Sequence, residues 1–80
     1  METIKNIITI DNAILGGQAV FKGTRVLVES IFTHLERGIS LNEFLDDFPS
    51  VTKEQAVAVL KIAEKIMTSK NIQKIYETAT

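Results

Sequence analysis

The spacing of apolar residues changes at Val28, and this change limits the possible folds more than any other feature of the sequence. Before it, β-branched residues cluster between Ile4 and Ile10 and end at the turn pair Asp11-Asn12. After it, apolar residues fall at i, i+3, i+4 and i+7, the spacing of an amphipathic helix: Val28, Ile31, Phe32 and Leu35. We therefore expect a mainly α protein with a small β part in its first third.

Three helices are expected beyond this point, each with recognisable ends. The first runs from Glu29 to Arg37 and is followed by Gly38, a residue typical just past a helix end. The second is short and acidic, begins with the capping box Ser40–Glu43 and ends before Pro49. A second capping box, Thr52–Gln55, begins a long third helix with a wide apolar stripe.

The β part contains a second reversal of the chain. Two apolar segments, Ala19–Phe21 and Val26–Val28, flank Lys22–Arg25, and Gly23 within that link can take a positive φ. A β-hairpin is therefore expected here.

We divide residues 1–80, a single domain, into a β-hairpin region (1–28), a three-helix core (29–69) and a C-terminal extension (70–80). The extension carries Ile72, Ile75 and Tyr76 at i, i+3 and i+4. It could continue the third helix, form a separate turn, or stay loose until a partner covers it.

Composition excludes several classes of protein. The 80 residues include no Cys, so neither disulfides nor thiolate metal sites are possible. The formal net charge is -1, so any DNA binding must use a local patch. A core this small is typically helped by oligomerisation or a partner. No signal-like apolar run occupies Met1–Ile10 and no run is long enough to span a membrane, so we expect a cytoplasmic protein without membrane contact.

No group of residues predicts catalysis, a metal or a cofactor. His34, the one histidine, has no carboxylate at i±3 or i±4. Asp46 and Asp47 are adjacent and so point about 100° apart on a helix. Lys22-Gly23-Thr24 has the wrong order for a phosphate-binding loop, in which glycine precedes lysine. We expect a protein that is not an enzyme.

The second and third helices and the break between them have the layout of a helix-turn-helix. Charge is divided between them: residues 40–52 carry three acids and no base, whereas residues 53–74 carry five Lys and two Glu. Lys53, Lys61 and Lys65, with Arg25 from the hairpin, are the candidate nucleic-acid contacts. The alternative is an interaction or dimerisation module that keeps the helix-turn-helix shape without binding DNA, which Glu54 favours.

The glycine-rich stretch before the helices has two interpretations. In the first, the glycines serve a tight hairpin, and Arg25 pairs with an acid or caps a helix carbonyl. In the second, Arg25 contacts phosphate or a partner protein.

Three segments in order carry a resemblance to a known family: Gly16–Val28, Leu35–Ser40 and Phe48–Thr52. Together they resemble the domain of unknown function 433 family, whose pattern joins GGxPxxxGTRxxV, a helix ending in GxS, and an acidic helix ending in an aromatic residue and proline. Ala19 and Leu27 stand where prolines are usual. The resemblance covers about Ile8 to Ala63, with these signature positions: Gly16, Gly17, Gly23, Thr24 and Arg25, and Gly38 and Pro49 as structural punctuation.

The resemblance implies a homeodomain-like three-helix core behind an N-terminal β-hairpin. Members look like antitoxins of type II toxin–antitoxin pairs, often encoded beside a PIN-like nuclease. We therefore expect an antitoxin-like regulator that binds DNA weakly as a homodimer and neutralises such a toxin. Ile72, Ile75 and Tyr76 are the candidate dimer or toxin contacts.

Overall fold

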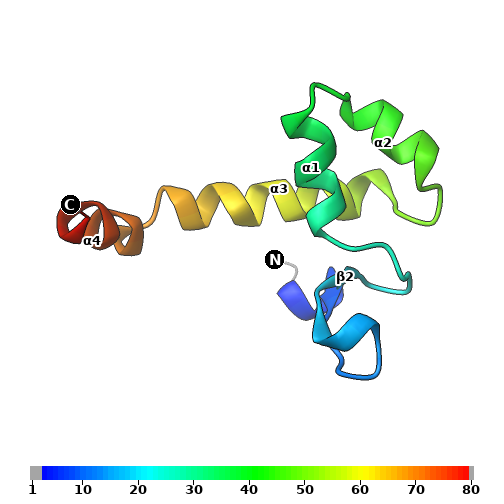
Figure 1. Ribbon diagram of the computed structural model, residues 1–80, viewed down its shortest axis with the longest axis horizontal. Helices are drawn as coiled ribbons and strands as arrows, with labels where there is room; N and C mark the ends of the chain where they lie inside the picture. The colour runs from blue at the N-terminus through cyan, green and yellow to red at the C-terminus, as the bar shows by residue number, and fades with distance from the viewer. Residues whose placement is uncertain (1–2, 80) are drawn as a thin grey trace.

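The computed structural model describes residues 3–79 (Figure 1). Within them, two strands and four α-helices follow one another, together with two short 3-10 helices, Ile4–Asn6 and Leu15–Gly17. The strands are β1 (Ile8–Thr9) and β2 (Val20–Phe21); the helices are α1 (Glu29–Glu36), α2 (Leu41–Asp47), α3 (Lys53–Met67) and α4 (Lys70–Thr78). The expectation of a mainly α protein with a small N-terminal β part is confirmed.

The β part is arranged differently from the expected hairpin. β1 pairs antiparallel with β2, with Ile8 opposite Phe21. The expected reversal at Lys22–Arg25 is also present: the Phe21 amide donates to the Val26 carbonyl at 3.0 Å and the Val28 amide donates to the Ala19 carbonyl at 2.9 Å, on either side of a bridge between Val20 and Leu27. Part of the β-branched run is helical instead, because the Asn6 amide donates to the Thr3 carbonyl at 2.9 Å. Local backbone bonds therefore override β propensity at the start of the chain.

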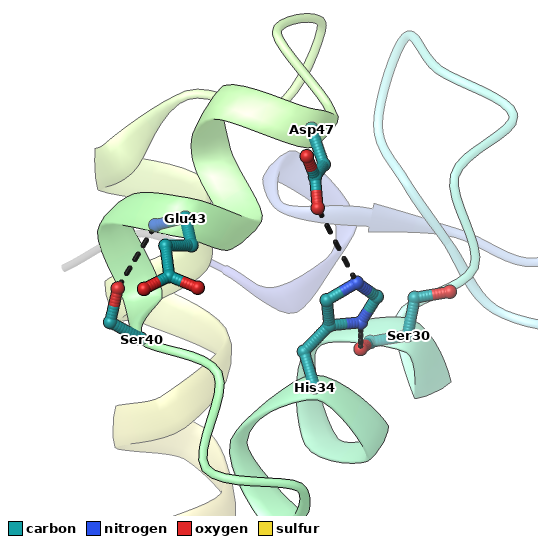
Figure 2. A network of polar contacts seen from close by, with 5 residues as sticks. All are labelled: Ser30, His34, Ser40, Glu43 and Asp47. Atoms are coloured by element: carbon teal, nitrogen blue, oxygen red, sulfur yellow. Dashed lines mark hydrogen bonds and ion pairs between the residues drawn. The ribbon is translucent and has the colours of Figure 1, made fainter.

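The first two helices match their expected ranges. α1 ends at Glu36, one residue before the expected end, and Arg37 is its C-cap. The Ser40 hydroxyl accepts the Glu43 amide hydrogen at 3.1 Å, which caps α2 (Figure 2). Within residues 3–79 this is the one half of the expected capping box that forms.

α3 begins with a complete capping box. The Thr52 hydroxyl accepts from the Gln55 amide at 3.1 Å, and the Gln55 side-chain oxygen accepts from the Thr52 amide at 3.0 Å. The helix ends where the Thr68 hydroxyl donates back to the Glu64 carbonyl at 2.9 Å. The extension then forms a separate helix, α4, so the described chain has four α-helices and not only the three of the expected core.

Eight apolar side chains are buried in residues 3–79, and all lie between Ile7 and Val59. The rings of Phe21 and Phe44, 6.1 Å apart, join the β part to the helices. The other buried residues are Ile7, Val20, Ile31, Val51, Ala56 and Val59. The core therefore occupies one end of the molecule, while α3 runs out of it and carries α4 at its far end (Figure 1).

Candidate nucleic-acid interface

The turn between β2 and Val26 is built by two signature residues. Gly23 has φ +79°, and the Thr24 amide donates to the Phe21 carbonyl at 3.0 Å. The Thr24 hydroxyl donates to the same carbonyl at 2.8 Å and accepts from the Val26 amide at 3.0 Å. These bonds give Gly23 and Thr24 a structural part in holding the turn that presents Lys22 and Arg25.

This turn is fixed to the beginning of α3. The Gln55 side-chain amide donates to the Lys22 carbonyl at 2.9 Å, across 33 residues of sequence. The same side chain closes the α3 capping box through its oxygen. One glutamine therefore connects the turn that carries Arg25 to the helix end that carries Lys53.

The four sequence-predicted DNA contacts are all exposed. Arg25 makes no ion pair or side-chain hydrogen bond with any residue between 3 and 79, so neither the expected acid partner nor a carbonyl cap is found there. Lys61 and Lys65 lie one turn apart on the same side of α3, about 12 and 18 Å along the axis from Lys53. The structure thus places the turn that carries Arg25 at the end of α3 that carries Lys53, whereas Lys61 and Lys65 lie further along the helix.

The remaining signature glycines lie in a different turn. Gly16 and Gly17 belong to the 3-10 segment between β1 and β2, with φ +68° and +86°. A Cβ on Gly17 would lie 2.7 Å from Asn12 Oδ1. The signature is therefore divided between two turns, and the second is hydrogen-bonded to α3 through Gln55.

The histidine has a carboxylate partner that helical spacing does not indicate. His34 Nε2 lies 3.9 Å from Asp47 Oδ2, while Nδ1–H donates to the Ser30 carbonyl at 2.7 Å (Figure 2). The ring also meets Phe44 and Phe48 edge-on, with centroids 5.3 and 5.6 Å apart. His34 thus packs α1 against α2.

Helical spacing around His34 within α1 does not predict this contact, because Asp47 lies on α2. Pairing positions equally distant from Ile39 across the α1–α2 turn would have indicated Phe44, with Asp47 one turn beyond. At 3.9 Å, with Asp47 64% exposed, this contact is long and open to solvent, and surface contacts of this kind contribute little to stability.

No group of three His, Asp or Glu side chains in residues 3–79 is placed to hold a metal ion. No helix in that range has the length and apolar character needed to cross a membrane.

The candidate partner contacts lie on α4. None of its nine residues, 70–78, is buried in the described structure. Tyr76 is 82% exposed and Ile75 60% exposed, whereas Ile72 is half-buried. α4 therefore presents apolar side chains that the rest of residues 3–79 does not cover.

Comparison with known proteins agrees with the signature turns and the helices behind them. The sequence model of the family described as "Protein of unknown function (DUF433)" matches residues 8–63. The chain therefore belongs to the DUF433 family.

A similar solved structure is the crystal structure of a DUF433 member protein from Anabaena variabilis ATCC 29413. It is 25% identical in sequence, with a TM-score of 0.66, over 89% of this chain and 68% of that chain. No curated protein shows a significant match. The resemblance stated from Ile8 to Ala63 is thus confirmed as family membership.

Proposed function

We propose that this protein is an antitoxin-like, DNA-binding regulator of a type II toxin–antitoxin pair. The observation that carries the DNA-binding part is the Gln55–Lys22 hydrogen bond, which fixes a turn with two cations at the amino end of α3. In helix-turn-helix proteins the second helix of the motif enters the major groove by that end. Lys22, Arg25 and Lys53 are then placed for phosphate contacts around it.

The arrangement of α1, α2 and α3 supports the same proposal. α2 and α3 are joined through the turn at 48–52, and α1 packs on α2 through His34 and Phe44. This order suits a homeodomain-like helix-turn-helix, with α4 as an addition outside it. Phe44 is fully buried and would hold the motif rigid.

The charges predict weak binding. Lysines contact phosphates as point charges, and α3 carries no arginine that could bind guanine bidentately. Each chain offers only a few phosphate contacts, and a homodimer would double them. We therefore propose a homodimer as the DNA-binding species.

The toxin part of the proposal rests on the family resemblance. On this proposal a PIN-like nuclease is the protein partner, and the half-buried Ile72 and the exposed Ile75 and Tyr76 contact either the toxin or a second copy. The protein itself would be neither an enzyme nor a cofactor carrier, and it would act in the cytoplasm.

A double charge reversal on α3 tests DNA binding. Lys61→Glu/Lys65→Glu should weaken binding to the DNA upstream of its own gene, and the slope of log K against log salt should become shallower by about 0.9 per lost phosphate contact. The matched control is Lys70→Glu/Lys74→Glu, the same change at the same spacing on α4. No measurable affinity of the wild type for this DNA would refute the DNA-binding role, and equal affinity of the α3 variant and the wild type would exclude Lys61 and Lys65 as contacts.

Co-expression tests the toxin. The product of the adjacent gene should co-purify with this protein, and its nuclease activity should fall when the two are mixed in equal amounts. A neighbour that neither binds nor loses activity would overturn the antitoxin assignment.

The second candidate is an interaction module without DNA binding. Two observations favour it: Glu54 lies on the same side of α3 as Lys61, and apolar side chains are exposed on α3 and α4. Unchanged DNA affinity in Lys61→Glu/Lys65→Glu, together with intact partner binding, would support this candidate over the first.

A further inference from the structure

An open apolar groove lies beside the core, on the side of α3 away from its lysines. Its walls come from three elements: Ile4 and Ile8 of the N-terminal segment, Val28 and Phe32 around the start of α1, and Ile62 and Ile66 of α3. Ile4 is 49% exposed and Ile66 61% exposed. The groove is thus a surface of exposed hydrocarbon with almost no polar lining.

The same chain carries a helix suited to such a groove. On α4 the apolar residues Ile72, Ile75 and Tyr76 stand at i, i+3 and i+4, so they form one face of the helix. Docking of an amphipathic helix into an apolar groove through anchors at this spacing is a recurring mode of recognition. Helix and groove are both left uncovered in residues 3–79.

The linker between α3 and α4 directs α4 away from its own groove. The Thr68 hydroxyl donates to the Glu64 carbonyl at 2.9 Å, and the Ser69 hydroxyl donates to the Ile66 carbonyl at 2.8 Å. The Ser69 carbonyl also accepts the Ile72 amide at 3.2 Å. With the linker held this way, α4 lies beyond the far end of α3 (Figure 1).

We propose that the groove is occupied by α4 of a second copy of this chain. In this reciprocal exchange around a twofold axis, each copy inserts Ile72, Ile75 and Tyr76 into the groove of the other. The inference builds on the homodimer of the proposed function and gives it an interface, but it needs neither DNA nor a toxin.

The buried area favours a second copy over a one-sided partner. A stable interface buries about 800 Å² on each partner. One helix with three anchors supplies only part of this, since an aromatic side chain buries about 150–250 Å². In the exchange, every copy contributes both a helix and a groove, so the contact forms twice. Ile66 and Met67, both more than half exposed, extend it along α3.

The exchange leaves the proposed DNA face free. At about 100° per residue, Lys61 lies about 120° around α3 from the midpoint of Ile62 and Ile66, and Lys65 lies about 80° from it. Dimerisation would therefore cover the apolar side of α3 and leave Lys61 exposed, with Lys65 at the edge of the interface.

The test is the mass of the full chain in solution, measured by analytical ultracentrifugation without DNA. Wild type should be a dimer, and Ile75→Gln/Tyr76→Gln should raise the dimer dissociation constant by at least about tenfold. The matched control, Lys70→Gln/Lys74→Gln, changes the opposite face of α4 and should leave the constant unchanged. A monomeric wild type, or a dimer unaffected by Ile75→Gln/Tyr76→Gln, would overturn the exchange.

Cross-linking gives a second measurement, which traps the exchanged helix in the groove instead of displacing it. The chain has no cysteine, so single cysteines can be introduced without background. A chain with Tyr76→Cys mixed with a chain with Ile4→Cys should form a disulfide-linked heterodimer under mild oxidation. The control mixture of Tyr76→Cys with Lys53→Cys should not. Equal cross-linking in both mixtures would contradict the exchange of α4. Absence of DNA binding would contradict the proposed function but not this exchange.

Discussion

The glycines of the signature have different structural roles in this fold. Gly23 takes φ +79° in a turn where a Cβ would meet no atom within 4 Å, so only the backbone conformation requires glycine. Gly17 has φ +86° and a neighbour as well, because its Cβ would lie 2.7 Å from Asn12 Oδ1. Two glycines of one motif are thus needed for different physical reasons.

Alanine substitution should separate these reasons. Gly23→Ala should lower the free energy of unfolding by about 1–2 kcal/mol, the cost of placing an L-residue in the left-handed region. Gly17→Ala should cost more, because Asn12 must also move. In an Asn12→Ala background the extra cost of Gly17→Ala should disappear. Urea unfolding of Gly23→Ala, Gly17→Ala, Asn12→Ala and the double variant Asn12→Ala/Gly17→Ala measures these costs. A cost for Gly17→Ala that is the same in both backgrounds would show that Asn12 plays no part.

Between elements, the Gln55 side chain carries the most consequential contact. It caps α3 through its oxygen and holds the Lys22 carbonyl through its nitrogen. A substitution that removes only the Gln55 side-chain nitrogen would separate the capping of α3 from the contact with Lys22.

Gln55→Glu makes that separation. The carboxylate can still accept the Thr52 amide and is favourable at a helix N-terminus, but it cannot donate to Lys22. Hydrogen exchange of the Thr24 amide should become about five- to tenfold faster, equivalent to about 1 kcal/mol, while exchange in α3 stays unchanged. Thr52→Ala is the counterpart: it should cost about 1 kcal/mol of stability through the lost cap and leave the Lys22 contact in place. Slower or unchanged exchange of the Thr24 amide in Gln55→Glu would mean that the Gln55–Lys22 hydrogen bond does not stabilise the turn.

The elements that sequence predicts well are those with local causes. Side-chain caps and the glycine or proline just past each end act within a few residues, so Ser40, Thr52 and Gly38 indicated the limits of α1, α2 and α3 closely. Contacts between distant segments were missed, because periodicity does not show how helices and strands meet: His34 with Asp47, and Gln55 with Lys22 across 33 residues. The sequence does not decide among helix, turn and coil for α4, because its residues gain no burial that would favour one of them.

At the scale of the whole molecule, the charged residues and the apolar groove occupy different surfaces. The Arg25 turn lies at the amino end of α3, Lys61 and Lys65 lie along one side of it, and the apolar groove lies on another. α4 extends from the far end. Such a division lets one chain pair with a copy of itself while keeping a charged surface exposed.

If α4 is exchanged, folding and dimerisation are linked, and thermal stability must depend on concentration. Raising the protein concentration a hundredfold should raise Tm by about 5–10 °C, given unfolding enthalpies typical of this size. Differential scanning calorimetry over that range measures the shift. Ile75→Gln/Tyr76→Gln should show a smaller change of Tm with concentration, because its dimer is weaker while its core, from Ile7 to Val59, contains no residue of α4. Lys70→Gln/Lys74→Gln should keep the full dependence. A wild-type Tm that stays constant over the hundredfold range would mean that α4 contributes to stability within one copy or not at all.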